Sequence, residues 1–137
     1  MKVAIAAVFV WLGMVVAISF VEAPLKFRAP GVTLPIGLAI GRIVFRTLNA
    51  IEVVLAIVVA AALVAGPRSG CVTVPLAVAI AVLALQIVAV RPRLARRSDQ
   101  VLAGSEAPRS RAHYVYIGLE MIKALALIAG GVLLLWR

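Results

Sequence analysis

Apolar residues along this chain fall into four long runs, separated by short segments rich in glycine, proline and charge. The first run, from Val3 to Val21, holds nineteen residues without a charge. A helix needs about 20 apolar residues to cross the ~30 Å hydrocarbon layer of a membrane. The pattern therefore predicts one all-α domain, a polytopic membrane protein with four transmembrane helices in an antiparallel bundle. We expect the helices at about residues 3–22, 34–65, 72–90 and 112–136.

The first run also has the outline of a secretory signal peptide, with Lys2 before it and Val-Glu-Ala at 21–23 after it. Its apolar core is longer than the roughly 7–15 residues of a signal peptide, and Pro24 would hinder cleavage after a small residue. We therefore expect a retained helix. Trp11, in the middle of this run, is expected to contact lipid or to pack against neighbouring helices.

The second run is long for a single membrane span. Thr33 is a suitable N-cap, and Pro35 would lie in the first turn, where a missing N–H costs little. One helix over residues 34–65 would be about 48 Å long. Either it tilts and protrudes, or the part before Gly41 lies at the membrane interface. Gly37 and Gly41 form a G-xxx-G pair, which permits close approach of another helix.

Composition supports the membrane class. The chain is 65% hydrophobic and 14% charged, with a mean hydropathy of +1.18. A net charge of +9 would indicate nucleic-acid binding in a soluble protein. Here most basic residues flank the apolar runs, where membrane topology accounts for them, so we expect no nucleic-acid partner. The single cysteine, Cys71, excludes an intrachain disulfide and a cysteine-based zinc cluster.

Basic residues are distributed unequally between the two ends of the predicted helices. Segments 23–33 and 91–111 carry eight Lys or Arg residues, and the start of the second helix adds two more. The other end has three, which are Lys2, Arg68 and Arg137. Because cytoplasmic loops are enriched in Lys and Arg, we expect the basic loops in the cytoplasm and both termini outside a plasma (inner) membrane.

Polar residues enter the second and fourth runs at helical spacing. At about 100° per residue, four polar residues of the second run, Arg42, Arg46, Asn49 and Glu52, fall within about 120° of one helix face. A similar stripe recurs between 113 and 123, and the third run contains one amide. A charge deep in a bilayer costs about 2.5–3.5 kcal/mol, so these residues should face each other in the cytoplasmic half of the bundle. The candidate buried polar cluster comprises Arg42, Arg46, Asn49, Glu52, Gln86, His113, Tyr116, Glu120 and Lys123.

This cluster has two interpretations. It is either an ion, proton or small-molecule site open to the cytoplasm, or a buried ion-pair network that fixes helix register. If Glu52, Glu120 and Lys123 all ionise, they carry one net negative charge, which favours a proton on one carboxyl because burial disfavours the charged form. A third role is lipid-headgroup or partner binding by the arginines of the hydrophilic segment, which are Arg91, Arg93, Arg96, Arg97, Arg109 and Arg111.

Sites for enzyme chemistry are not indicated. His113 has no second histidine nearby, which makes a metal site unfavourable, and its neighbours Tyr114 and Tyr116 suit the membrane interface. The chain has no Ser-His-Asp set, phosphate loop or dinucleotide motif. We therefore expect a non-enzyme without a metal or other cofactor.

Several short motifs resemble a known family. They are Trp11-Leu12-Gly13, Glu22-Ala23-Pro24 followed by Phe27, Gly41-Arg42-Ile43-Val44-Phe45, and the segment from Arg111 to Lys123. At these positions the chain resembles the transmembrane protein 205-like family, a domain of unknown function in small bacterial membrane proteins. The resemblance implies a four-helix membrane fold and brings no reaction with it. The arginine-rich segment departs from the family pattern.

The sequence thus favours a small transport-related or accessory membrane protein with an inner-leaflet polar cluster. Four helices enclose little volume, so a permeation path would lie between copies of the chain in a homo-oligomer. One alternative is an assembly subunit of a larger membrane complex, whose arginine-rich segment docks a partner membrane protein or anionic lipid headgroups. Another is a membrane-bound redox or cofactor-holding enzyme that uses His113 and the tyrosines.

Overall fold

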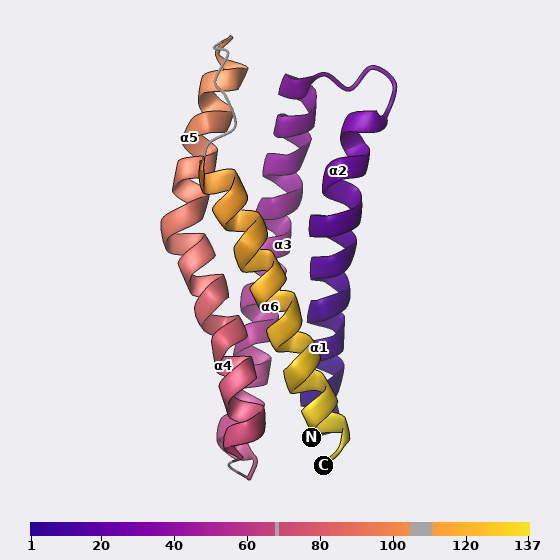
Figure 1. Cartoon of the computed structure of the whole chain (residues 1–137), viewed down its shortest axis with the longest axis vertical. Coiled ribbons are helices and arrows are strands. Elements are labelled where there is room, and N and C mark those ends of the chain that lie inside the picture. The colour runs from indigo at the N-terminus through magenta and orange to yellow at the C-terminus, as the bar shows by residue number, and fades with distance from the viewer. Residues whose placement is uncertain (68, 105–110) are drawn as a thin grey trace.

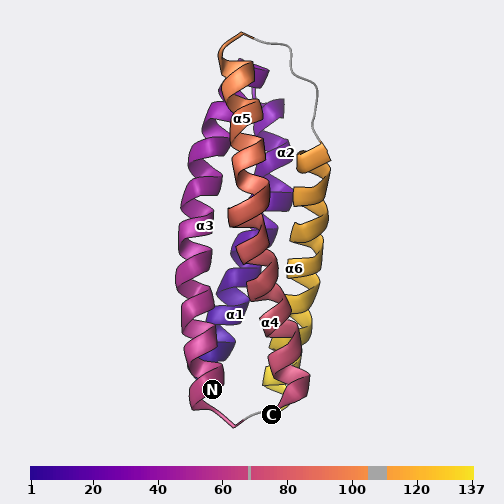
Figure 2. The ribbon, with the colours of Figure 1, turned by 90° about the vertical axis from the view of Figure 1, so that its left-hand side faces the viewer.

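The computed structural model describes residues 1–67, 69–104 and 111–137. Within these residues there is no β-strand, and four long helical segments lie side by side along the longest axis (Figures 1 and 2). Each segment is long and apolar enough to cross a membrane. The N- and C-termini lie at one end, and the 29–33 connection lies at the other (Figure 1). The prediction of an all-α chain with four long apolar helices is confirmed.

The first helical segment is longer than the predicted 3–22. It comprises α1 (Lys2–Val15), the π-helical η1 (Val16–Glu22), α2 (Ala23–Leu25) and the 3₁₀ turn η2 (Lys26–Arg28). The helix continues through Pro24, beyond the predicted end at residue 22. Pro24 has no N–H to donate, and the preceding Ala23 donates instead to the carbonyl of Ile18, five residues back. The widened turn accommodates the proline within a continuous helix.

The second segment, α3 (Leu34–Ala65), is one unbroken helix, so the interruption considered near Gly41 does not occur. The Thr33 hydroxyl accepts a hydrogen bond from the Ile36 N–H at 3.5 Å, which confirms the predicted N-cap. Gly37 faces the end of the first segment. A Cβ atom there would lie 2.1 Å from Cε1 of Phe27, so the G-xxx-G pair does permit a close approach.

The third segment runs from α4 (Gly70–Leu85) through the π-helical η3 (Gln86–Val90) into α5 (Arg91–Leu102). The prediction that residues 91–111 form a loop is therefore wrong for 91–102. The helix accommodates its proline by the same widened turn as in the first segment: the N–H of Arg91, directly before Pro92, donates to the carbonyl of Gln86, five residues back. Residues 91–102 suit a helix because arginine, leucine, alanine and glutamine are good helix formers. The helix is also held against α3, since Arg42 of α3 pairs with Asp99 of α5.

The fourth segment is α6 (Arg111–Leu135), which packs closely against α4. A Cβ atom on Gly130 would lie 2.4 Å from Cδ2 of Leu76, so the helices meet where α6 has no side chain. The core between the segments is apolar and includes Val8, Val59 and Leu127. The outer surface is also apolar: Ile43, Val64 and Val88 are 70 to 79% exposed. Such a surface is unfavourable in water and suits contact with lipid.

Candidate functional site

Four polar side chains from three segments meet inside the protein. Glu52 comes from α3, Gln86 from the start of η3, and Glu120 and Lys123 from α6. Each is only 0 to 1% exposed. Glu120 and Lys123 share a face of α6 because they are three residues apart. The sequence-based expectation that these charges face each other rather than the outer surface agrees with this geometry. We call these four residues the inner cluster.

Lys123 is the centre of the inner cluster. Its Nζ lies 2.5 Å from Oε1 of Glu52 and 2.7 Å from Oε1 of Glu120. It also donates a 2.8 Å hydrogen bond to Oε1 of Gln86. An ammonium group has three N–H donors and no acceptor, so the three donors of Lys123 have three acceptors. These interactions hold α3, η3 and α6 together at one height along the long axis of the bundle.

Gln86 and Trp11 complete the network. The Gln86 amide donates to Oε1 of Glu120 at 2.7 Å while its own oxygen accepts from Lys123, so it joins both members of the ion pair. Trp11 of α1 is fully buried and donates its indole N–H to Oε1 of Glu52 at 2.9 Å. All four segments therefore contribute to one polar network.

The role of Trp11 was not predicted, because the residue was assigned to packing or lipid contact. One signal was available in the sequence. A buried indole N–H usually finds a hydrogen-bond acceptor, and a carboxylate on a neighbouring helix was expected in the same interior.

Each of the two carboxylates in the inner cluster makes hydrogen bonds through only one of its two oxygen atoms. Both present Oε1 to Lys123, whereas Oε2 of Glu52 and Oε2 of Glu120 have no hydrogen-bond partner among the described residues. Buried polar atoms in proteins usually have such a partner. The inner cluster thus holds two carboxyl groups, one ammonium group and spare acceptor capacity. It can bind a further proton without new side chains.

Two further predicted residues lie between the inner cluster and the end of the bundle that carries α5. Asn49 is three residues before Glu52, and Tyr116 is four residues before Glu120, so each lies on the same helix face as the carboxylate that follows it. Both are buried, and neither Oδ1 of Asn49 nor the Tyr116 hydroxyl has a partner among the described residues. The Tyr116 ring packs edge-on against Phe45 at 5.7 Å.

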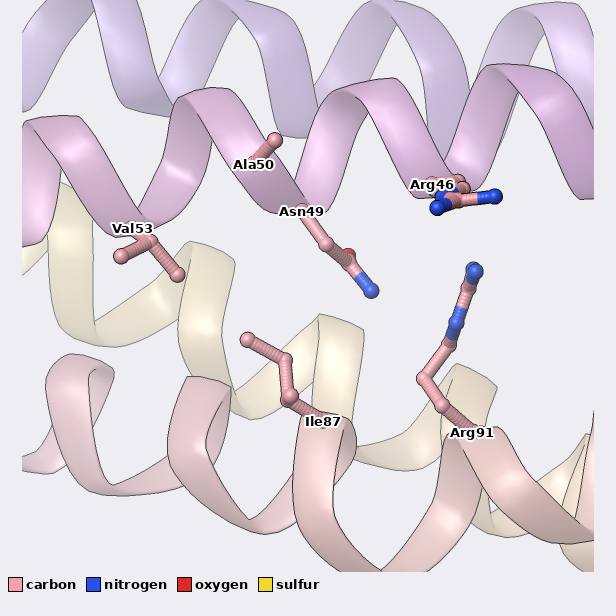
Figure 3. Close-up of a pocket in the computed structure, with 6 residues that line it drawn as sticks. All are labelled: Arg46, Asn49, Ala50, Val53, Ile87 and Arg91. Atoms are coloured by element: carbon pink, nitrogen blue, oxygen red, sulfur yellow. The ribbon is translucent and has the colours of Figure 1, made fainter.

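A groove of about 280 Å³ lies beside these residues, between α3 and the junction of η3 with α5. Figure 3 shows Arg46 and Arg91 approaching each other across it, with the Asn49 side chain directed into the space between them. Ala50, Val53 and Ile87 line the remainder. We call this surface the arginine groove. Arg91 was expected at a general headgroup-binding surface, and the structure places it opposite Arg46.

Other predicted residues lie away from the inner cluster. Arg42 is ten residues before Glu52, about 15 Å along the helix, and pairs with Asp99. His113 is equally far from Lys123 on α6, with its ring 5.7 Å from that of Tyr114. The remaining basic residues show no convergence on the cluster: Arg93, Arg96 and Arg111 are exposed, Arg97 is half-buried, and Arg109 lies outside the described residues.

No group of three or more His, Cys, Asp or Glu residues suited to a metal ion occurs in the described part of the chain. Comparison of the chain with models of protein families, with curated proteins and with solved structures gave no match. The family resemblance noted from the sequence therefore stays a hypothesis.

Proposed function

We propose that this chain is a small, non-enzymatic membrane protein with a transport-related or accessory role, whose inner cluster binds and releases a proton. In this proposal it crosses the inner membrane as an antiparallel four-helix bundle, with both termini outside. The apolar outer surface and the concentration of basic residues near α5 support this orientation. The inner cluster would then lie in the cytoplasmic half of the bilayer.

The charge balance of the inner cluster carries the proposal. Glu52 and Glu120 share one ammonium group in a site that is only 0 to 1% exposed. With all three groups ionised, one negative charge would be left without compensation. An uncompensated buried charge is strongly destabilising. A proton on either carboxyl group removes that charge, and the two unpartnered Oε2 atoms are available to carry it.

Access to the inner cluster is proposed from the α5 end only. Asn49 and Tyr116 place polar atoms without partners in the described structure between the cluster and that end. Water can bridge buried polar groups of this kind. Toward the termini the interior is filled by fully buried apolar side chains such as Val59 and Leu127. One chain therefore exchanges protons with one side, and any path across the membrane would lie between copies of the chain.

Infrared spectroscopy of the reconstituted protein tests the proton count. The wild type is expected to show one protonated carboxyl group at neutral pH. Replacing Glu120 by Gln should remove that signal, since Lys123 then balances Glu52 alone, and Glu52→Gln should do the same for Glu120. Glu22→Gln is the matched control, because Glu22 is half-buried and lies outside the inner cluster. A wild type without a protonated carboxyl group, or a signal that survives both cluster substitutions, contradicts the proposal.

Cysteine labelling tests the proposed orientation in the membrane, because the chain has one cysteine of its own. Cys71, the only cysteine, is exposed at the start of α4, near the end that holds the termini. In intact bacterial cells it is expected to react with a membrane-impermeant maleimide. The double variant Cys71→Ser/Ala29→Cys places the thiol in the opposite connection and should react only after permeabilisation. The reverse pattern would show that the inner cluster lies in the outer half of the membrane.

A further inference from the structure

The arginine groove has features that the proton-binding proposal does not use. Arg46 projects from α3 and Arg91 from α5, and Figure 3 shows the two side chains approaching each other across the groove. Three other cations of the bundle have carboxylate partners: Lys26 pairs with Glu22, Arg42 with Asp99, and Lys123 with two glutamates. In the described residues no ion pair involves the two groove arginines. Two like charges at one site favour a bound anion.

Asn49 adds an independent observation. Its side chain points into the groove (Figure 3), yet the residue is only 8% exposed and its Oδ1 has no hydrogen-bond partner among the described residues. A buried amide oxygen without a hydrogen-bond donor is costly. The side chain offers two N–H donors and one acceptor. It can donate to an oxyanion held by the arginines or accept from a neighbouring hydroxyl group.

We propose that the arginine groove binds the phosphate group of an anionic phospholipid. Guanidinium groups match phosphate oxygens in geometry and form paired, charge-assisted hydrogen bonds with them. Arg46 and Arg91 hold the phosphate from two helices, and Asn49 contacts the phosphate or a headgroup hydroxyl. The volume of about 280 Å³ is near the lower limit of ordinary ligand pockets. It suits a headgroup with the first part of its chains rather than a whole lipid.

The apolar part of the groove favours a lipid over free phosphate. From Arg46 to Val53 the groove follows eight residues of α3, about 10 Å along the helix. Ala50, Val53 and Ile87 lie toward the middle of the bundle and offer an apolar wall to an acyl chain. From the α5 end toward the middle of the bundle, the lining of the groove changes from polar to apolar. A phospholipid of the cytoplasmic leaflet has the same order, with its headgroup at the surface and its acyl chains deeper. The inference depends on membrane insertion but not on proton binding by the inner cluster.

Native mass spectrometry of the detergent-solubilised full chain tests the site with two lipid probes, phosphatidylglycerol and phosphatidylcholine. The wild type is expected to retain one phosphatidylglycerol in preference to phosphatidylcholine. The variant Arg46→Gln/Arg91→Gln should bind phosphatidylglycerol at least about tenfold more weakly, because each arginine supplies a charge-assisted bond. The matched control Arg93→Gln/Arg96→Gln removes the same charge from exposed positions of α5 and should bind as the wild type does.

The results distinguish binding at the arginine groove from general attraction between a basic protein and an anionic lipid. They also distinguish a phospholipid ligand from inorganic phosphate. Equal weakening in the two double variants would overturn the proposal, because net charge alone would then account for binding. Inorganic phosphate is added as a competitor at millimolar concentration. Displacement of phosphatidylglycerol by phosphate at the same concentration for short and long acyl chains would overturn the lipid assignment. Tighter binding of the longer chains supports it. An infrared result against proton binding would leave this test unaffected.

Discussion

Replacing Lys123 by Met is expected to lower the free energy of unfolding by about 3–5 kcal/mol, the cost of removing one partner from a buried ion pair. The substitution leaves Glu52, Glu120 and the Gln86 oxygen directed at a site that no longer holds a donor. The measurement is thermal or denaturant unfolding in mild detergent. Lys2→Met is the matched control, because Lys2 is exposed at the start of α1 and should tolerate the change.

A second substitution distinguishes a structural from a functional inner cluster. Glu52→Gln/Lys123→Met leaves Glu120 as the one carboxyl group of the inner cluster, and a single proton removes its charge, so part of the lost stability should return. If the double variant also restores the phenotype of the wild type, the network serves only to fix helix register. If stability returns while the proton signal stays altered, the charges have a role beyond packing. A single Lys123→Met variant as stable as Lys2→Met would contradict the assigned geometry.

Replacing Trp11 by Ala is expected to cost a similar amount, about 3–5 kcal/mol, because a large buried side chain leaves a cavity. It also removes the indole N–H from Oε1 of Glu52. Trp136→Ala is the matched control, since Trp136 is 87% exposed. Unfolding in mild detergent compares the two, and an equal effect at both positions would show that Trp11 does not lie in the core.

Trp11→Phe separates the two contributions of Trp11. Phenylalanine fills most of the volume but has no N–H, so the loss should fall to about 1–3 kcal/mol, the cost of an unpaired buried polar group. Combining Trp11→Phe with Glu52→Gln in a double-mutant cycle measures the coupling between the two side chains. Coupling near zero would show that the hydrogen bond contributes nothing to stability.

The helices and the inner cluster could be predicted for the same physical reason. Charges are so unfavourable in a membrane interior that their positions on a helix indicate which face is turned inward. Helical spacing placed Glu120 and Lys123 on one face of the fourth helix, and Glu52 was expected opposite them. Gln86, as the one amide in the third run, was included on the same grounds. The structure brings these four residues together.

Other features depend on information that helical spacing does not contain. Spacing gives direction around a helix but not which residues of other helices lie at the same level, so Arg42 and His113 were grouped with residues about 15 Å away along their helices. The pairing of Arg42 with Asp99 required α5 to continue beyond Pro92. Polarity at residues 91–102 had suggested a loop. The widened turns before Pro24 and Pro92 show why neither proline ended its helix.

The position of Lys123 in the chain has a consequence for biosynthesis. Helices emerge from the ribosome in order, and α6, which carries both Glu120 and Lys123, emerges last. It also has the lowest mean hydropathy of the four segments. The i, i+3 pair between these two residues allows partial neutralisation within α6 before it meets other helices. If the chain inserts into a membrane as proposed, Glu52 and Gln86 are already synthesised by then and provide acceptors for Lys123 as this least apolar segment leaves the translocation machinery.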